Sequence, residues 1–232
     1  DQPRSRGRGD VYKRQGPQGA LSAGLGLTHD DIEDTIYDVM LDSHTSIHSA
    51  IQHTGVAGLD LVPANIDLSA AEIQMVNEVG REHTLARALR PVRRDYDFII
   101  IDCQPSLGLL TVNALACSQG VIIPMESEFF SLRGLALLTD TVEKVSDRIN
   151  FDLEVMGILL TMFDRRTKHA REVMSRVVDY FGDKVFDTVI TRTVRFPETS
   201  VAGEPITTWA PNSPATQQYR NLAKEVIERS TV

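Results

Sequence analysis

The sequence predicts an α/β fold in which a mostly parallel, twisted sheet is flanked by helices. Short apolar runs rich in β-branched residues alternate with longer segments of helical spacing, and this alternation is typical of βαβ units. One run, residues 98–102, is a Phe followed by three Ile and a carboxylate, which indicates a strand buried on both faces. A chain of 232 residues with 42% hydrophobic side chains can bury such a core as one domain.

The expected strands are apolar, β-branched runs bounded by turn residues. In chain order they are residues 59–63, 98–102, 121–124, 155–163 and 185–190. Pro105 prevents the second of them from continuing, because proline lacks the N–H that a strand ladder needs.

The expected helices lie between these runs and show apolar residues at helical spacing. They are residues 32–41, 69–79, 83–89, 107–116, 132–149, 168–181 and 214–229. Ser131 can cap the fifth of them. Residues 197–214 are rich in Pro and Gly and predict an extended loop, and loops of that length are often functional.

Residues 1–15 are expected to lie outside the domain, which would span residues 16–232. The segment is basic, rich in Gly, Arg and Ser, and without hydrophobic periodicity, as in disordered arms. Residues 11–15 also resemble translated sequencing adapter joined to a broken reading frame, in which case the true N-terminus is missing. The alternative is a genuine basic arm that binds nucleic acid.

Composition excludes several classes of protein. The net charge of −8 argues against a surface that is basic throughout, so any nucleic-acid contact requires a local cluster. No apolar stretch approaches the roughly 20 residues of a membrane span, and no signal peptide is visible. We therefore expect no membrane partner and a cytoplasmic location. Two cysteines describe neither a disulfide framework nor a four-ligand zinc site.

Asp102 is expected at the carboxyl end of its strand, the edge at which open parallel sheets bind ligands. A carboxylate there can hold the water shell of a magnesium ion on nucleotide phosphates, so the run predicts a Walker B strand. The alternative is a buried strand that happens to end on Asp. The usual companion is a Gly-x-x-x-x-Gly-Lys-Ser/Thr loop, and no Gly-Lys dipeptide occurs in the chain.

Two further groups of residues can carry chemistry. Thr161 and Asp164 end an apolar run in an arrangement that can bind a purine edge, although Thr at a strand end is also a common turn former. Arginines cluster in residues 165–171 and at 192 and 195, where they could hold phosphates or simply form a solvated charged face.

With these pieces in order, the chain resembles the ParA/Soj family of partition ATPases, deviant Walker A P-loop proteins that position bacterial chromosomes and plasmids. The resemblance runs from about Gly16 to the C-terminus. Its marks are residues 17–19, 24–26, 96–107, 124, 128–135, 161–167 and 193–195, and residues 191–199 look like the actinobacterial version. The resemblance implies a P-loop NTPase-like fold.

The resemblance also implies a cycle and its cofactors. ATP with Mg²⁺ drives formation of a homodimer, the dimer binds DNA without sequence preference, and a ParB-type centromere-binding protein triggers hydrolysis. The protein would then be associated with the nucleoid. By the same resemblance Asp102 orders the metal, and Pro105 belongs to the switch segment that follows. The base-side pocket would be formed by Thr161, Met162, Thr191 and Arg192.

Arg166 and Arg195 match the two arginines of the family that are implicated in DNA binding. Lys224, on the last helix, is a further DNA candidate.

The chain departs from the family at its start. The first strand, the Lys-Gly-Gly-Val-Gly-Lys-Thr-Thr type loop and the first helix are lacking, and Gly16 stands where the family has a water-positioning aspartate. We therefore expect no intact catalytic residue, no productive binding of ATP and no meaningful hydrolysis, because charge stabilisation at the phosphoryl group is lost. An unpaired sheet edge would also lower solubility.

Two hypotheses follow. The first is a partition ATPase truncated at its N-terminus; the second is a nucleotide-independent DNA-binding or scaffold protein that has lost its P-loop. A MinD-like division protein is a further alternative, but it would need a basic amphipathic membrane helix at its end, and only Ser230, Thr231 and Val232 follow the last helix. A nitrogenase-reductase-like role does not fit Cys103 and Cys117.

Overall fold

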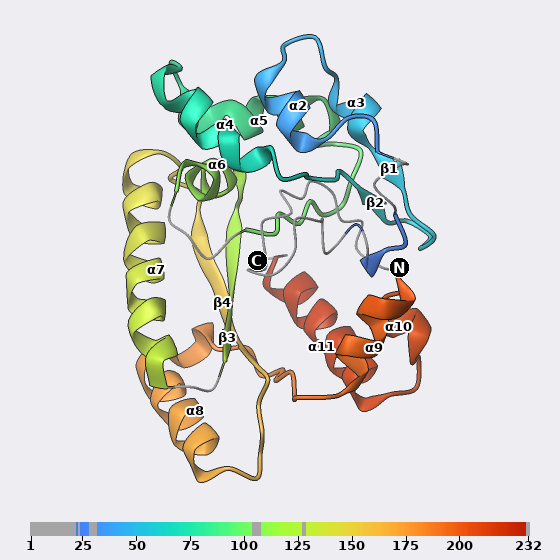
Figure 1. Cartoon of the computed structure of the whole chain (residues 1–232). Coiled ribbons are helices and arrows are strands. Elements are labelled where there is room, and N and C mark those ends of the chain that lie inside the picture. Colours follow the sequence, from blue (N-terminus) through green and yellow to red (C-terminus); the bar gives the residue numbers. More distant parts are fainter. Residues whose placement is uncertain (1–21, 23, 28–31, 104–107, 127–128, 231–232) are drawn as a thin grey trace. The chain divides into compact units, whose positions relative to one another are not determined.

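The structure, a computed structural model, describes residues 22, 24–27, 32–103, 108–126 and 129–230 (Figure 1). The chain divides into two compact units. Unit 1 comprises Asp1–Cys117 and Glu198–Pro205, and unit 2 comprises Ser118–Pro197 and Ile206–Val232. The predicted domain boundary at residue 16 lies outside the described residues.

Unit 2 is built on a parallel pair of strands, as predicted. Strand β3, Gly120–Glu126, pairs with β4, Glu154–Thr161, and the helix α7, Phe129–Arg148, connects them. The register runs from Gly120 opposite Glu154 to Glu126 opposite Thr161, with one irregularity at which Met156 has no partner on β3. This connection is the βαβ unit that the alternating sequence pattern indicates.

Helices cover both faces of this pair. On one face, side chains of the strands pack with α7 and with α8, Lys168–Phe181, in a buried cluster of Ile123, Met125, Leu135, Ile158, Leu160, Val173, Val177 and Val185. On the other face, Leu159, Phe186 and Ile190 pack with residues of α11, Pro214–Arg229. Figure 1 shows α7 and α8 together on one side of the two strands and α11 on the other. Unit 2 is therefore a three-layered α/β unit.

The predicted strand at residues 185–190 is wrong as a continuous strand. The segment makes two isolated parallel bridges, Ile158 with Val185 and Phe163 with Thr191. Between them the N–H groups of Asp187 and Thr188 donate to the carboxylate of Glu225 on α11. Toward β4, the N–H groups of Phe186 and Ile190 still donate to the carbonyls of Ile158 and Leu160, so the Glu225 side chain takes the place of a strand only on the other side of the segment.

Unit 1 is mainly helical. Its elements are α2 (Ile36–Leu41), α3 (Ile47–Ala50), α4 (Leu68–Gln74), α5 (Thr84–Leu89) and α6 (Leu109–Cys117), with the 3₁₀ turns Met75–Asn77, Arg81–His83 and Arg90–Val92. They bury a core that includes Ile36, Ala50, Val62, Met75 and Val92. The predicted strand at 59–63 is reduced to β2, Asp60–Leu61, which pairs antiparallel with β1, Gln52–His53.

The predicted Walker B strand at residues 98–102 does not form. These residues are extended chain without a strand assignment, and no ladder of the described residues includes them. Ile99 and Ile101 pack against the core of unit 1, whereas Ile100 is 57% exposed. Without a hydrogen-bonded neighbour, an apolar run of this kind buries one face only.

Most predicted helices are confirmed, and α8 and α11 have the predicted bounds. Ser131 is not the cap of the fifth, because α7 already begins at Phe129. The loop predicted at 197–214 is wrong in part, since α9 (Arg195–Ala202) and α10 (Ile206–Trp209) form there. Pro197 and Pro214 lie in first turns and Pro205 lies just before α10, where the missing N–H costs nothing, and Pro211 lies in the turn between α10 and α11.

Among the described residues, no helix is long and apolar enough to cross a membrane.

Candidate functional site

The end of β4 and the segment after residue 185 meet at one edge of unit 2. The N–H of Phe163 donates to the carbonyl of Ile190 over 3.1 Å, and the N–H of Arg192 donates back to the carbonyl of Phe163 over 3.3 Å. Four of the predicted base-side residues therefore lie on two adjacent stretches of backbone: Thr161, Met162, Thr191 and Arg192. Their use in nucleotide binding stays a prediction.

Met162 has an unusual backbone at this edge. Its φ of 51° is the only positive value for a non-glycine residue in the described part of the chain. An L-residue in this region meets its own carbonyl group and is strained, and such strain gathers at ligand sites. The side chain is 40% exposed, so packing alone does not account for the conformation.

Gln218 of α11, which the sequence did not single out, fixes Thr191. Its Oε1 accepts from the Thr191 N–H over 3.0 Å, and its Nε2 donates to the Thr191 hydroxyl over 3.0 Å. Both the oxygen and the nitrogen of the Gln218 amide are thus bonded to Thr191, one of the predicted base-side residues. Gln218 is a positioning residue for this edge.

Glu225 and Arg229, also missed, brace the same segment from α11. Arg229 donates to the carbonyls of Met156 and Val185 and to Glu225, each over 2.9 Å, and its guanidinium lies 4.2 Å from the centre of the Phe186 ring. Burial raises the pKa of Glu225, but the N–H donors of Asp187 and Thr188 and the Arg229 charge outweigh it. The net pKa lies below its ordinary value.

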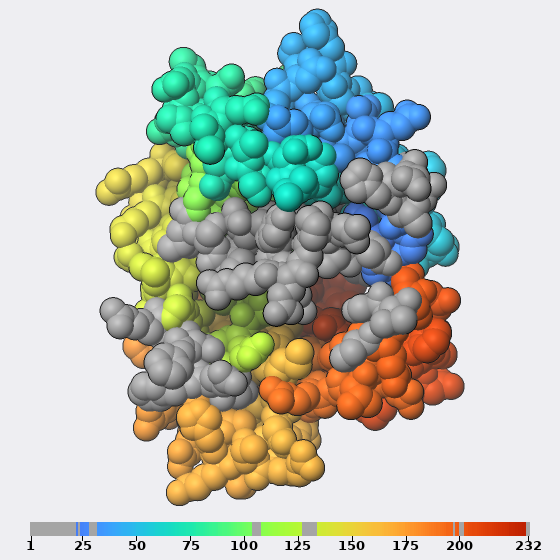
Figure 2. All heavy atoms as spheres, in the orientation of Figure 1, coloured from blue at the N-terminus to red at the C-terminus, as the bar shows by residue number. Residues whose placement is uncertain are grey.

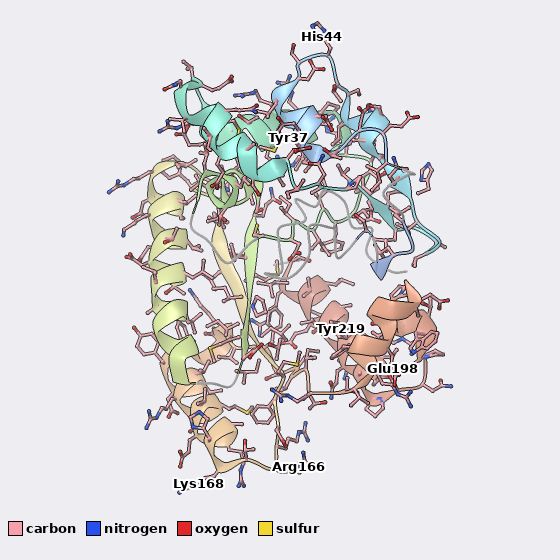
Figure 3. The ribbon with its side chains drawn as sticks, viewed as in Figure 1. Tyr37, His44, Arg166, Lys168, Glu198 and Tyr219 are labelled. Carbon is pink, nitrogen blue, oxygen red and sulfur yellow. The ribbon has the colours of Figure 1, made fainter. Side chains whose placement is uncertain are left out.

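Arg166, predicted to bind DNA, lies in the turn before α8 and is engaged within the chain. Its Nε and Nη2 donate to the two carboxylate oxygens of Asp164, each over 3.0 Å. Hydrogen bonds from Arg166 hold the pKa of Asp164 down at about 2. The arginine side chain is 89% exposed, and Figure 3 shows it pointing outward beside Lys168.

The other DNA candidates are also exposed residues of unit 2. Arg195 is the first residue of α9, and the adjacent Phe196 packs edge-to-face on Tyr219 of α11 with ring centres 5.8 Å apart. Lys224 lies on the exposed side of α11. In Figure 2, atoms of α8 and of α9 and α10 lie on the visible surface of the molecule.

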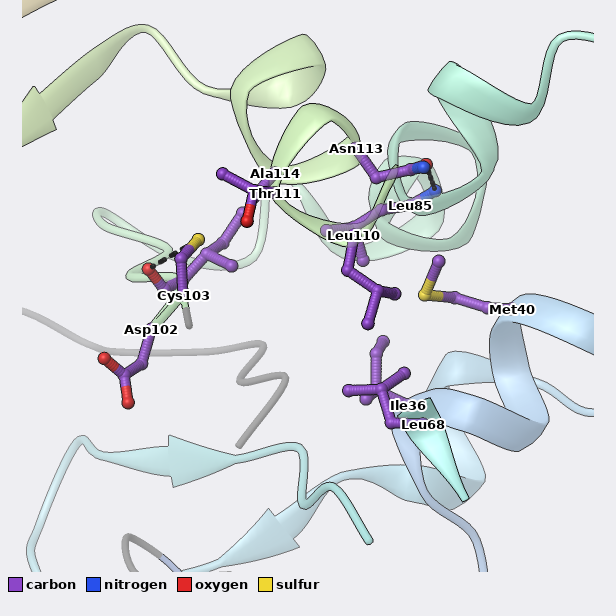
Figure 4. Close-up of a pocket in the computed structure, with 11 residues that line it drawn as sticks. Ile36, Met40, Leu68, Leu85, Asp102, Cys103, Leu110, Thr111, Asn113 and Ala114 are labelled. Carbon is purple, nitrogen blue, oxygen red and sulfur yellow. Dashed lines mark hydrogen bonds between the residues drawn. The ribbon is translucent and has the colours of Figure 1, made fainter. Parts of the chain in front are cut away.

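Asp102 lies in unit 1, at a small cavity of about 30 Å³ (Figure 4). Most of its lining is apolar and comes from α2, α4, α5 and α6. In Figure 4 the Asp102 carboxylate points away from Ile36, Met40 and Leu110. The neighbouring Cys103, which also lines the cavity, is exposed.

This cavity does not fit a nucleotide. A volume of about 30 Å³ holds one or two water molecules, whereas ligand pockets measure roughly 300 Å³ or more. The described residues also contain no group of three His, Cys, Asp or Glu side chains that could hold a metal ion. Pro105, the other predicted residue of this region, lies outside the described residues.

Comparison with known proteins adds the family context. A family model described as an AAA domain matches residues 15–155. An uncharacterised protein of Mycobacterium tuberculosis is 68% identical over 213 residues, which are 92% of this chain and 67% of the relative. The sporulation initiation inhibitor protein Soj of Bacillus subtilis is 46% identical over 90% of this chain and 83% of its own length. The chromosome-partitioning ATPase Soj of Treponema pallidum is 44% identical over 92% and 83%.

Solved structures agree on the fold. Cobyrinic acid a,c-diamide synthase from Mycobacterium smegmatis, with an ATP analogue and magnesium bound, superposes with a TM-score of 0.80 and 33% identity over 96% of this chain and 81% of that one. The cell division ATPase MinD of Pyrococcus furiosus gives a TM-score of 0.73 at 20% identity over 97% and 86%, a likeness of fold alone. The fold is that of a P-loop NTPase, with a parallel sheet flanked by helices.

Proposed function

Because the chain belongs to the ParA/Soj family of chromosome-partitioning ATPases, we propose that it serves chromosome or plasmid partitioning. In this role it forms an ATP-dependent dimer that binds DNA without sequence preference and associates with the nucleoid. A ParB-type centromere-binding protein regulates the dimer. The relationship to partition ATPases supports the proposal.

The observation that carries DNA binding is the basic edge of unit 2. Arg166 directly precedes the N-cap of α8, Arg195 is the first residue of α9, and Arg192 lies three residues before it, all with exposed side chains. A chain with a net charge of −8 needs such a local cluster to attract phosphates. Arginine suits this task, because its planar fork grips phosphate oxygens in pairs.

Nucleotide binding by the family uses ATP and Mg²⁺, and the proposed contacts here are Asp102 for the metal and the edge around Thr161, Met162, Thr191 and Arg192 for the base. The 232 residues contain no Gly-Lys-Ser/Thr loop. We therefore expect this chain by itself to release no phosphate from ATP at a rate above background.

The test compares two proteins. One is the 232-residue chain. In the other, residues 1–15 are replaced by a strand, a Lys-Gly-Gly-Val-Gly-Lys-Thr-Thr loop, a helix and a second strand of the family pattern, and Gly16 is replaced by Asp. Binding of a random-sequence DNA duplex is measured by fluorescence anisotropy with ATP, with ADP and without nucleotide, and phosphate release is measured in parallel. We expect ATP to strengthen DNA binding, and hydrolysis to occur, only in the second protein. The 232-residue chain should bind DNA weakly at low salt, without a response to nucleotide.

Three substitutions control this test. Arg166→Glu and Arg195→Glu are expected to abolish binding. Arg148→Glu, at the last residue of α7, makes the same change in charge at the opposite end of the strands and is expected to leave binding intact. If Arg148→Glu weakens binding as much as the other two, the basic edge is not the site.

A second candidate is a nucleotide-independent DNA-binding or scaffold protein. The lack of a Gly-Lys dipeptide in the sequence favours it. Equal DNA affinity with ATP, with ADP and without nucleotide in both proteins would support this candidate and contradict the partition ATPase.

A further inference from the structure

Asp164 and Arg166 form a closed contact on the turn between β4 and α8. Oδ1 of Asp164 accepts from both the backbone N–H and Nε of Arg166, and Oδ2 accepts from Nη2, all over 3.0 Å. The backbone contact is an Asx turn, which fixes the direction of the carboxylate. The guanidinium is thus held along one of its two forked edges.

We propose that Asp164 is a built-in counter-ion that competes with DNA phosphates for Arg166 and so limits the affinity of the basic edge. This proposal rests on the proposed function, since it assumes that Arg166 binds DNA. It assigns to Asp164 a role different from the purine contact that the sequence suggested.

The geometry favours competition. The Nε and Nη2 edge that Asp164 occupies is one of the edges on which an arginine grips two phosphate oxygens. A phosphate that approaches this edge must displace the carboxylate or meet its charge. Asp164 thus neutralises one positive charge of the basic cluster. A chain with a net charge of −8 depends on that cluster to attract DNA phosphates.

The turn itself keeps the carboxylate in place. The hydroxyl of Thr167 donates to the Asp164 carbonyl over 3.1 Å and accepts from the N–H of Ala170 over 3.3 Å as the N-cap of α8. Asp164 and Thr167 are therefore tied to each other, and Thr167 is tied to the helix. The side chain of Arg166 can leave, but Asp164 stays at the site.

The charge of Asp164 persists under all physiological conditions. Its pKa of about 2, set by Arg166 and by the nearby charge of Arg192, leaves the carboxylate ionised at neutral pH. A change of pH within the cell therefore does not release Arg166. A competing anion does.

The test uses Asp164→Asn in the full chain, because Asn keeps the Asx turn and removes the charge. The dissociation constant for a short random-sequence DNA duplex is measured at low salt for the wild type, Asp164→Asn, Arg166→Gln and the double variant. Asp140→Asn is the matched control, since it breaks the exposed pair of Asp140 with Lys144 on α7, whose atoms lie 2.6 Å apart. Far-UV circular dichroism and urea unfolding check that each variant folds.

We expect Asp164→Asn to bind DNA about two- to fivefold more tightly than the wild type, the range that the loss of an exposed ion pair allows. Asp140→Asn should leave the constant unchanged. In the Arg166→Gln background, Asp164→Asn should give no gain beyond that of the control.

The remaining outcomes overturn one claim or the other. Unchanged or weaker binding by Asp164→Asn would overturn the competition, and weaker binding would mean that Asp164 orients Arg166 for DNA. A gain that persists in the Arg166→Gln background would also overturn it. If Arg166→Gln alone has no effect on binding, or if neither the wild type nor Asp164→Asn binds DNA, the proposed DNA site fails as well.

Discussion

Met162 offers the most direct test at the scale of the residue. Its φ of 51° places an L-residue in the left-handed region at the edge of unit 2. Both Met162→Gly and Met162→Ala remove the side chain, but only glycine relieves the clash of Cβ with the backbone. We expect the Gly variant to have a free energy of unfolding about 1 kcal/mol higher than the Ala variant, measured in urea. Equal stability of the two would show that the backbone relaxes.

Gly157 is expected to tolerate no side chain. A Cβ atom there would overlap the ring of Phe186, which is 2% exposed and stacked under Arg229. Gly157→Ala should therefore lower the free energy of unfolding by about 1–3 kcal/mol. Gly134→Ala is the control: it lies in α7 with nothing within 4 Å of its Cβ position. There the better helix former should raise stability by roughly 0.5–1 kcal/mol.

Some residues of the candidate site were singled out from the sequence, and others were missed. Thr161, Met162, Thr191 and Arg192 were predicted from the resemblance to the partition ATPases, and the structure brings them to one sheet edge, while their use in nucleotide binding stays a prediction. Gln218, Glu225 and Arg229 could not be predicted, because their role depends on a segment 27 to 44 residues away. A signal existed, since these polar residues recur at helical spacing within a face that also carries Leu222 and Val226.

At the scale of the element, Arg229 ties α11 to Met156 of β4 and to Val185. It donates to two carbonyls and to Glu225 in a fork that lysine cannot reproduce. We expect Arg229→Lys to lower the free energy of unfolding by about 1–3 kcal/mol. Arg220→Lys, which changes an exposed contact with the Pro211 carbonyl, should change it by less than about 0.5 kcal/mol. Equal losses in urea would contradict the special role of Arg229.

Glu225 makes this tie sensitive to pH. Its folded pKa lies below the ordinary value of 4.5, so the unfolded chain binds the proton more readily. The stabilisation is present above pH 4.5 and is lost as pH falls through the folded pKa. We expect Glu225→Gln to flatten stability against pH just below 4.5. Asp164 loses its contribution to stability in a different range, as the pH falls from 3.8 to about 2. The Glu225→Gln variant should therefore still lose stability in that lower range.

Helices were predictable from the sequence where their start is local. Thr167 and Ser213 accept from the N–H groups of Ala170 and Thr216, and these caps mark the starts of α8 and α11. The strands at 98–102 and 185–190 were mispredicted because a ladder depends on a neighbour that the run itself does not encode. Apolar composition predicted burial but not pairing.

At the scale of the whole molecule, the acidic charge would make the proposed DNA binding a local property. The net charge of −8 opposes any polyanion, so under this proposal the affinity for DNA has to come from a few contacts at the basic edge of unit 2. Each phosphate contact releases counterions and adds about 0.9 to the slope of log affinity against log salt. The slope therefore reports the number of phosphate contacts. An affinity measured at one salt concentration also includes the repulsion between DNA and the net charge of the chain.

We expect Arg166→Gln and Arg195→Gln each to reduce this slope by about one contact, because each side chain would no longer displace counterions. Arg148→Gln makes the same change of charge at the end of α7 and should lower affinity slightly without changing the slope. Anisotropy titrations of a random-sequence duplex over a series of salt concentrations measure all three. If the three variants shift affinity equally at one slope, only the net charge matters and DNA has no defined site on unit 2. A loss of slope confined to Arg166 and Arg195 would locate the phosphates at the starts of α8 and α9.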